Sequence, residues 1–161
     1  MIKEFEFFHG AVLSKLIREE KFCDTLTKFN SESNSSFIFN EQIGIYIKYS
    51  TKRMSPWNFT FMKAHQDEIR EMKKSLSEVF VVLVCNDDGI VCLSYSELKK
   101  VLDENHEDVE WISASRKNGG MYSIKGKDGE LPKKIAVNDF PNKLFAVIKK
   151  TPTAKQKKLL F

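Results

Sequence analysis

The residues with the clearest capacity for chemistry lie in a short alternating segment around Lys48. Residues 43–50 alternate apolar and mixed side chains, which is typical of a β-strand. Tyr46 and Lys48 then fall one pleat apart on the same face. An ammonium group on a strand face can bind a phosphate oxygen. Lys48 is therefore a candidate for phosphate binding.

Cations, a hydroxyl and an aromatic ring follow Lys48 in close order. Lysine, arginine and serine contact phosphate oxygens, and a tryptophan ring offers a face on which a base can stack. A histidine at the start of the next predicted helix could contact phosphate or act as a general base. The candidate nucleic-acid contacts are Lys48, Ser50, Lys52, Arg53, Trp57 and His65. The competing interpretation is a solvated strand face with Trp57 in the core.

Hydrophobic periodicity predicts the elements that must position these residues. Helices are expected at residues 8–22, 63–77 and 95–104, and strands at 37–39, 43–50, 57–61, 79–85, 90–93, 110–115, 121–125 and 135–137. The continuous apolar run 79–85 is typical of a strand buried on both faces. Ser94 and Glu97 predict a capping box at the start of the third helix.

The opening order of one helix, three strands, a helix and a buried strand resembles the core of the PD-(D/E)xK nuclease superfamily. The resemblance covers residues 8–85, and Lys48 stands where the motif places its lysine. The motif's two acid positions hold Ser36 and Tyr46. The resemblance implies an α/β (α+β) fold with a restriction-endonuclease-like core: a mixed central sheet flanked by helices. The later strands predict extra C-terminal β-hairpins.

The same resemblance implies a set of catalytic candidates and a metal. Lys48 and Tyr46 would occupy the motif strand, and Glu19 or Glu20 would be the acid of the first helix. Glu41 is a nearby carboxylate that could serve as a metal ligand. An active member of the superfamily would use Mg²⁺, which prefers oxygen ligands and activates water for attack on phosphate.

Composition and length predict one α/β domain over residues 1–150 and a basic tail over residues 151–161. The chain has 161 residues, 42% of them hydrophobic, which suffices for a core without disulfides or metal. Its net charge of +4 depends on five lysines in the last thirteen residues. Without them 21 basic and 22 acidic residues remain, so any basic surface is local. No signal peptide or membrane span is evident, and we expect a cytoplasmic protein.

The end of the tail resembles the short peptide by which bacterial DNA-processing proteins bind the sliding clamp. Gln156, Leu160 and Phe161 match its polar and apolar positions. Docking of these apolar residues on the protein's own core is the alternative.

Two classes of function remain open from the sequence. One is a nucleic-acid-binding protein on a nuclease-like scaffold, or a protein-interaction or immunity module built on the same scaffold. The other is a divergent Mg²⁺-dependent nuclease acting in restriction, repair or phage defence. A carboxylate pair close to the Lys48 ammonium would favour the enzyme.

Overall fold

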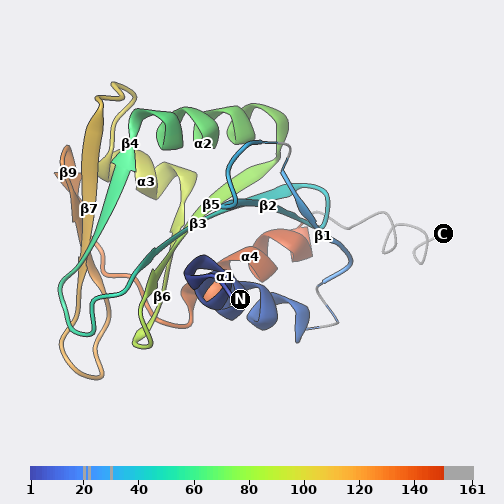
Figure 1. Cartoon of the computed structure of the whole chain (residues 1–161), viewed down its shortest axis with the longest axis horizontal. Helices are drawn as coiled ribbons and strands as arrows, with labels where there is room; N and C mark the ends of the chain where they lie inside the picture. The colour runs from blue at the N-terminus through green and yellow to red at the C-terminus, as the bar shows by residue number, and fades with distance from the viewer. Residues whose placement is uncertain (20, 22, 30, 151–161) are drawn as a thin grey trace.

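The computed structural model describes residues 1–19, 21, 23–29 and 31–150. Figure 1 labels the elements of this α+β fold along the chain. They are α1 (Glu4–Ile17), β1 (Leu26–Lys28), β2 (Ser36–Phe39), β3 (Ile43–Ser50), β4 (Trp57–Met62), α2 (Lys63–Ser75), β5 (Glu78–Cys85), β6 (Gly89–Ser94), α3 (Tyr95–Val101), β7 (Val109–Ser115), β8 (Ser123–Gly126), β9 (Gly129–Glu130) and α4 (Asp139–Lys150).

A five-stranded mixed sheet with the order β1-β2-β3-β5-β6 forms the centre of the fold. Strands β3 and β5 are parallel, with Lys48 opposite Leu83, and the other neighbours are antiparallel. The predicted central strand is confirmed, because Val79 to Cys85 are all buried in β5. The predicted capping box is confirmed as well: the Ser94 hydroxyl accepts the Glu97 amide at the start of α3.

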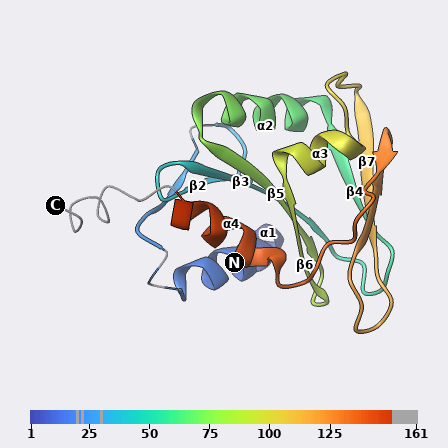
Figure 2. The same ribbon diagram turned by 180° about the vertical axis from the view of Figure 1, so that it is seen from behind.

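The two faces of this sheet pack into two separate hydrophobic cores. Helices α1 and α4 cover one face, where Val12 of α1 and Phe145 of α4 meet the isoleucines of β3. Helices α2 and α3 cover the other face, where Ile69 and Leu98 join Tyr46. Figure 2 shows the same arrangement from behind, with the sheet between the two pairs of helices. The predicted alternation of β3 therefore decides which core each side chain enters.

The third strand of the predicted opening unit leaves the central sheet. Strand β4 pairs with β7, and the order β4-β7-β8-β9 makes a separate antiparallel sheet. Phe59 and Phe61 of β4 and Ile112 of β7 are buried against the α2 side of the central sheet. The expectation of three consecutive strands in one sheet is corrected here. The structure has a five-stranded mixed sheet and a second, four-stranded antiparallel sheet beside it.

The end of the described chain also differs from the prediction. The expected strand at residues 135–137 contributes a single isolated bridge between Ile135 and Tyr122. Helix α4, which was not predicted, begins at Asp139 and covers the α1 side of the sheet with Leu144. The tail residues 151–161, including the predicted clamp-binding Gln156, Leu160 and Phe161, lie outside the described residues.

Candidate functional site

Lys48 lies near the carboxyl end of β3 and faces the first turn of α2. Tyr46 is buried on the same face, as the alternation predicts. The Nδ1 atom of His65 lies 3.3 Å from the Lys48 ammonium nitrogen. The same nitrogen lies 5.3 Å from the centre of the Phe61 ring. Two strands and a helix thus bring Lys48 and His65 together.

The Lys48 ammonium is desolvated but not neutralised. Burial lowers the pKa of Lys48 to about 8. Within the described part of the chain, no carboxylate oxygen lies within 4.0 Å of its nitrogen. Its close partners are an imidazole and a phenyl ring, which attract a cation without cancelling its charge. A cation in this state is stabilised by any anion that reaches it.

The His65 ring presents an acceptor to Lys48. Its Nδ1 atom accepts the backbone N–H of Met62 at 3.1 Å, so the proton of the neutral ring lies on Nε2. Burial is the main cause that lowers the pKa of His65, and the charge of Lys48 lowers it further, whereas Glu68 opposes both. At neutral pH His65 is therefore an uncharged ring beside a charged lysine.

Glu68 is a site residue that the sequence analysis missed. Its Oε2 atom accepts hydrogen bonds from the hydroxyls of Ser33 at 2.7 Å and Ser36 at 2.6 Å. Burial, and then the charge of Glu68, raise the pKa of the Tyr46 hydroxyl, which stays protonated. The i, i+3 spacing of His65 and Glu68 on a predicted helix was the available signal. Ser36 therefore serves as a partner of the α2 carboxylate.

The acids proposed from the nuclease resemblance are not brought to Lys48. Glu19 is exposed just after α1, and α1 covers the sheet face opposite Lys48. Glu41 is exposed in the turn before β3, and the five steps along the strand from Ile43 to Lys48 span roughly 16 Å. Glu20 lies outside the described residues.

The donor set around Lys48 does not fit a magnesium ion. Glu68 is the carboxylate whose charge acts on this cluster, and two serine hydroxyls already occupy its Oε2 atom. Magnesium prefers near-octahedral oxygen coordination, often with more than one carboxylate or phosphate. Lys48 and the neutral His65 ring add no oxygen ligand.

The basic loop that follows β3 carries exposed cations. Lys52 and Arg53 are both exposed between Ser50 and β4. The Ser50 hydroxyl accepts the Lys52 amide at 3.3 Å, and the indole N–H of Trp57 donates to the Lys52 carbonyl at 2.8 Å. Trp57 is 2% exposed, because its ring fills the core between the two sheets. It anchors the loop, and its faces are not free to stack on a base.

An open hollow of about 350 Å³ extends this loop toward β7 and the β5–β6 turn. It is lined by Arg53, Met54, Ser55, Trp57, Asp88, Arg116 and Asn118. Arg116, which sequence reasoning did not single out, forms a two-pronged ion pair with Asp88 at 2.7 and 3.1 Å. Its backbone N–H donates to the Ser55 hydroxyl at 3.1 Å, which joins the end of β7 to the basic loop.

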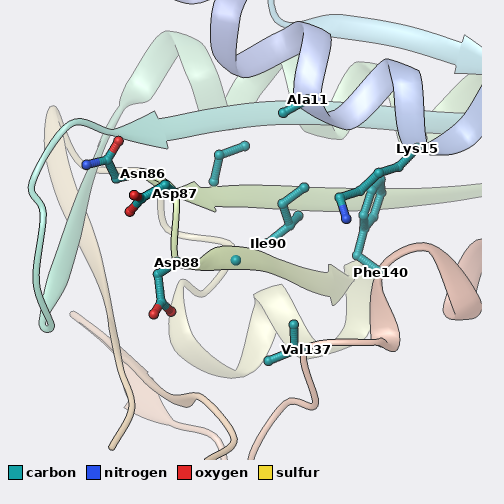
Figure 3. A pocket seen from close by; sticks show the side chains of 10 residues that line it. Ala11, Lys15, Asn86, Asp87, Asp88, Ile90, Val137 and Phe140 are labelled. Carbon is teal, nitrogen blue, oxygen red and sulfur yellow. The ribbon is translucent and has the colours of Figure 1, made fainter. Parts of the chain in front are cut away.

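Figure 3 shows another hollow, of about 270 Å³, beside the carboxyl end of β5. Lys15 of α1, Asn86 and Asp87 of the turn, and Phe140 line its wall (Figure 3). Asp88 borders this hollow as well as the one beside the basic loop. Because Lys15 comes from the helix layer opposite α2, this hollow is separate from the Lys48 cluster.

Comparison with family models, with curated proteins and with solved structures finds no match for this chain. The structure shows a mixed α/β fold with a five-stranded mixed sheet and assigns the chain to no family. No helix among the described residues is long and apolar enough to cross a membrane.

Proposed function

We propose that this protein binds the phosphate backbone of a nucleic acid without cleaving it. Lys48 would be the half-buried cation at the centre of the surface, and Lys52 and Arg53 the exposed cations at its edge. The observation that carries the proposal is the Lys48 ammonium, which is desolvated and has no carboxylate within 4.0 Å among the described residues.

An incoming phosphate supplies the negative charge that this site lacks. A charge-assisted hydrogen bond to a phosphate oxygen is stronger than a neutral one. The negative charge of the phosphate also favours the protonated form of the lysine, which burial disfavours. Since the pKa of Lys48 is about 8, the ammonium form still predominates at neutral pH. The His65 ring accepts one of its three protons, which leaves others for a ligand.

The basic loop extends the contact beyond a single phosphate. Lys48 and Ser50 lie one pleat apart near the end of β3, and Lys52 and Arg53 follow as exposed residues. Single strands and duplexes carry closely spaced phosphates, so several cations along one edge match a backbone better than a lone anion. Trp57 contributes by holding the Lys52 carbonyl, which limits the motion of the loop.

The divergent nuclease and the protein-interaction module are the competing functions. The nuclease would require carboxylates at Lys48 to hold Mg²⁺, and Glu19 and Glu41 lie elsewhere. A protein partner with an acidic surface could engage the same cations. Substrate tests with Mg²⁺ and the salt dependence of binding separate these possibilities.

The test measures fluorescence polarisation with labelled single-stranded DNA, duplex DNA and RNA at low and moderate salt. Lys48→Met, which keeps the side-chain volume but removes the charge, should weaken binding at least tenfold. The double variant Lys52→Ala/Arg53→Ala should weaken it and reduce its salt dependence. Lys125→Ala removes an exposed charge from β8 and should bind like the original protein.

Absence of binding to all three probes at low salt would refute the proposal. Equal affinity of Lys48→Met and Lys125→Ala would refute the role of Lys48. Cleavage of any probe in the presence of Mg²⁺, abolished by Lys48→Met, would favour the nuclease instead.

A further inference from the structure

A cluster of carboxylates lies on the second sheet, next to α2. One carboxylate oxygen from each of Asp103, Glu110 and Asp128 lies within 4.8 Å of the others. Asp103 follows α3, Glu110 belongs to β7, and Asp128 lies in the turn between β8 and β9. Glu110 is fully buried, whereas the two aspartates are exposed. The cluster therefore has a buried floor and a side open to solvent.

Two oxygen atoms at the floor of this cluster receive no hydrogen bond from a donor of the described residues. Gln66 of α2 is 2% exposed and donates its side-chain amide to the Glu110 carboxylate. Within the described part of the chain no donor reaches the Oε1 atom of Gln66 or of Glu110, and the carboxyl group of Asp128 lies close to that of Glu110 instead. Because both amide atoms of Gln66 are bonded to one carbon, its unpartnered oxygen is also held beside the Glu110 carboxylate. Buried oxygens without donors are costly, and a bound ion or water is a usual explanation.

The charge of the cluster is also incompletely balanced. The Lys127 ammonium lies 4.0 Å from Glu110 Oε1, but it also pairs with Glu107. Lys99 feels the charges of Glu110 and Asp103 and is itself paired with Glu104 at 3.8 Å. Three carboxylates against two ammonium groups that other acids share leave an excess of negative charge among the described residues.

We propose that Asp103, Glu110 and Asp128, with the side-chain oxygen of Gln66, bind a hard divalent cation of the calcium class. The donors are all oxygen atoms, as Ca²⁺ requires. Ligands up to 4.8 Å apart accommodate two metal–oxygen bonds of about 2.3–2.6 Å each. No histidine or cysteine joins these three acids in the described chain, so the donor set does not suit zinc. Water would complete the shell on the exposed side.

This site shares no residue with the proposed nucleic-acid surface and would tie four segments together. The end of α3, β7, the β8–β9 turn and α2 each contribute one ligand, and α2 and α3 lie beside β4 and β7 in Figure 1. A ligand that binds the folded chain and not the unfolded chain raises the midpoint of unfolding. Cation binding is therefore measurable in the protein alone.

The experiment combines isothermal titration calorimetry with thermal unfolding after removal of trace metal by a chelator. CaCl₂ is titrated first, with MgCl₂ and MnCl₂ for comparison and NaCl at equal ionic strength as the screening control. Asp128→Asn is the main variant, because the amide oxygen of asparagine can still accept the Asp103 backbone N–H. Asp103→Asn is the second variant. Asp108→Asn, a nearby exposed acid outside the cluster, is the matched control.

The expected result is one Ca²⁺ per chain and a higher unfolding temperature. Asp128→Asn and Asp103→Asn should each weaken binding at least tenfold, while Asp108→Asn binds normally. The inference is wrong if millimolar Ca²⁺, Mg²⁺ and Mn²⁺ all give no heat and no change of unfolding temperature. It is also wrong if the cations stabilise all variants equally, because that would indicate screening of charge.

A third result would contradict it as well: Asp128→Asn unfolds at a higher temperature without metal, and metal does not change the unfolding temperature of the original protein. Relief of repulsion between carboxylates would then explain the cluster.

Discussion

At the residue scale, two of the predicted nucleic-acid contacts lie in different environments. Lys48 is partly exposed, whereas Trp57 is buried in the core. Alternation in β3 was enough to predict that Lys48 shares a face with Tyr46, because the strand period fixes side-chain direction. The alternation of residues 57–61 predicts one buried face for β4, but it does not show that this face meets a core between two sheets. Whether an aromatic residue stacks on a base or fills a core depends on which surface covers it, and that surface comes from distant segments.

The first prediction concerns the stability cost of Lys48. Because the pKa of Lys48 is about 8 in the folded protein and 10.5 ordinarily, the unfolded chain binds more protons between these pH values. The free energy of unfolding should therefore rise with pH over that range, and the penalty is present in full below it. Lys48→Met should raise the free energy of unfolding at pH 7 by about 1–3 kcal/mol. Urea denaturation from pH 7 to 10 measures both effects, and a destabilised variant would contradict this account.

The second prediction concerns the pH dependence of nucleic-acid binding. Loss of the Lys48 proton near pH 8 removes the central charge, so affinity should fall between pH 7 and 9. Lys48→Arg keeps its charge throughout this range because arginine stays protonated. The affinity of that variant should vary less with pH in polarisation titrations. Parallel curves for both proteins would assign the pH dependence to another group.

At the element scale, local patterns predicted the helices and strands that border the site but not all of their partners. The run from Val79 to Cys85 and the capping box at Ser94 are local signals, and both are confirmed. Glu68 was missed because its relevance depends on the register that sets Ser36 opposite Tyr46 across β2 and β3. Register and sheet membership depend on long-range contacts, which a single sequence does not display.

The third prediction tests the docking of α3 on the second sheet. A side chain at Gly126 would place its Cβ 2.5 Å from the backbone carbonyl oxygen of Val101, which cannot rotate away. Gly126→Ala should therefore destabilise the protein by about 1–3 kcal/mol. Gly10→Ala in α1 meets no atom of the described residues within 4 Å and should be neutral or stabilising by about 0.5–1 kcal/mol. Guanidinium denaturation compares the two, and equal effects would contradict close packing at Gly126.

At the scale of the whole molecule, the positive charge has a local distribution. Apart from the last thirteen residues, basic and acidic residues nearly balance. Lys52 and Arg53 therefore matter because both are exposed in the same loop, and not because basic residues outnumber acidic ones over the whole surface. A surface of this size should give moderate affinity that depends strongly on ionic strength.

The fourth prediction quantifies that dependence. Each phosphate neutralised by a cation releases counterions, so the logarithm of affinity falls with the logarithm of salt concentration by about 0.7–0.9 per contact. Lys52→Ala/Arg53→Ala should reduce this slope by about 1.4–1.8 if both residues contact phosphate. The slope is obtained from polarisation titrations at several NaCl concentrations, with Lys125→Ala as control. An unchanged slope would exclude both residues from the interface.

The first turns of α2 hold two neighbouring residues with different partners: His65 meets Lys48, and Gln66 meets Glu110. A small rotation of this helix end would change both contacts together. Thermodynamic linkage then makes the two occupancies reciprocal, since any factor by which calcium alters affinity for nucleic acid must equal the factor by which nucleic acid alters affinity for calcium. Measuring the affinity of each ligand in the presence and in the absence of the other would give the coupling free energy between the two sites.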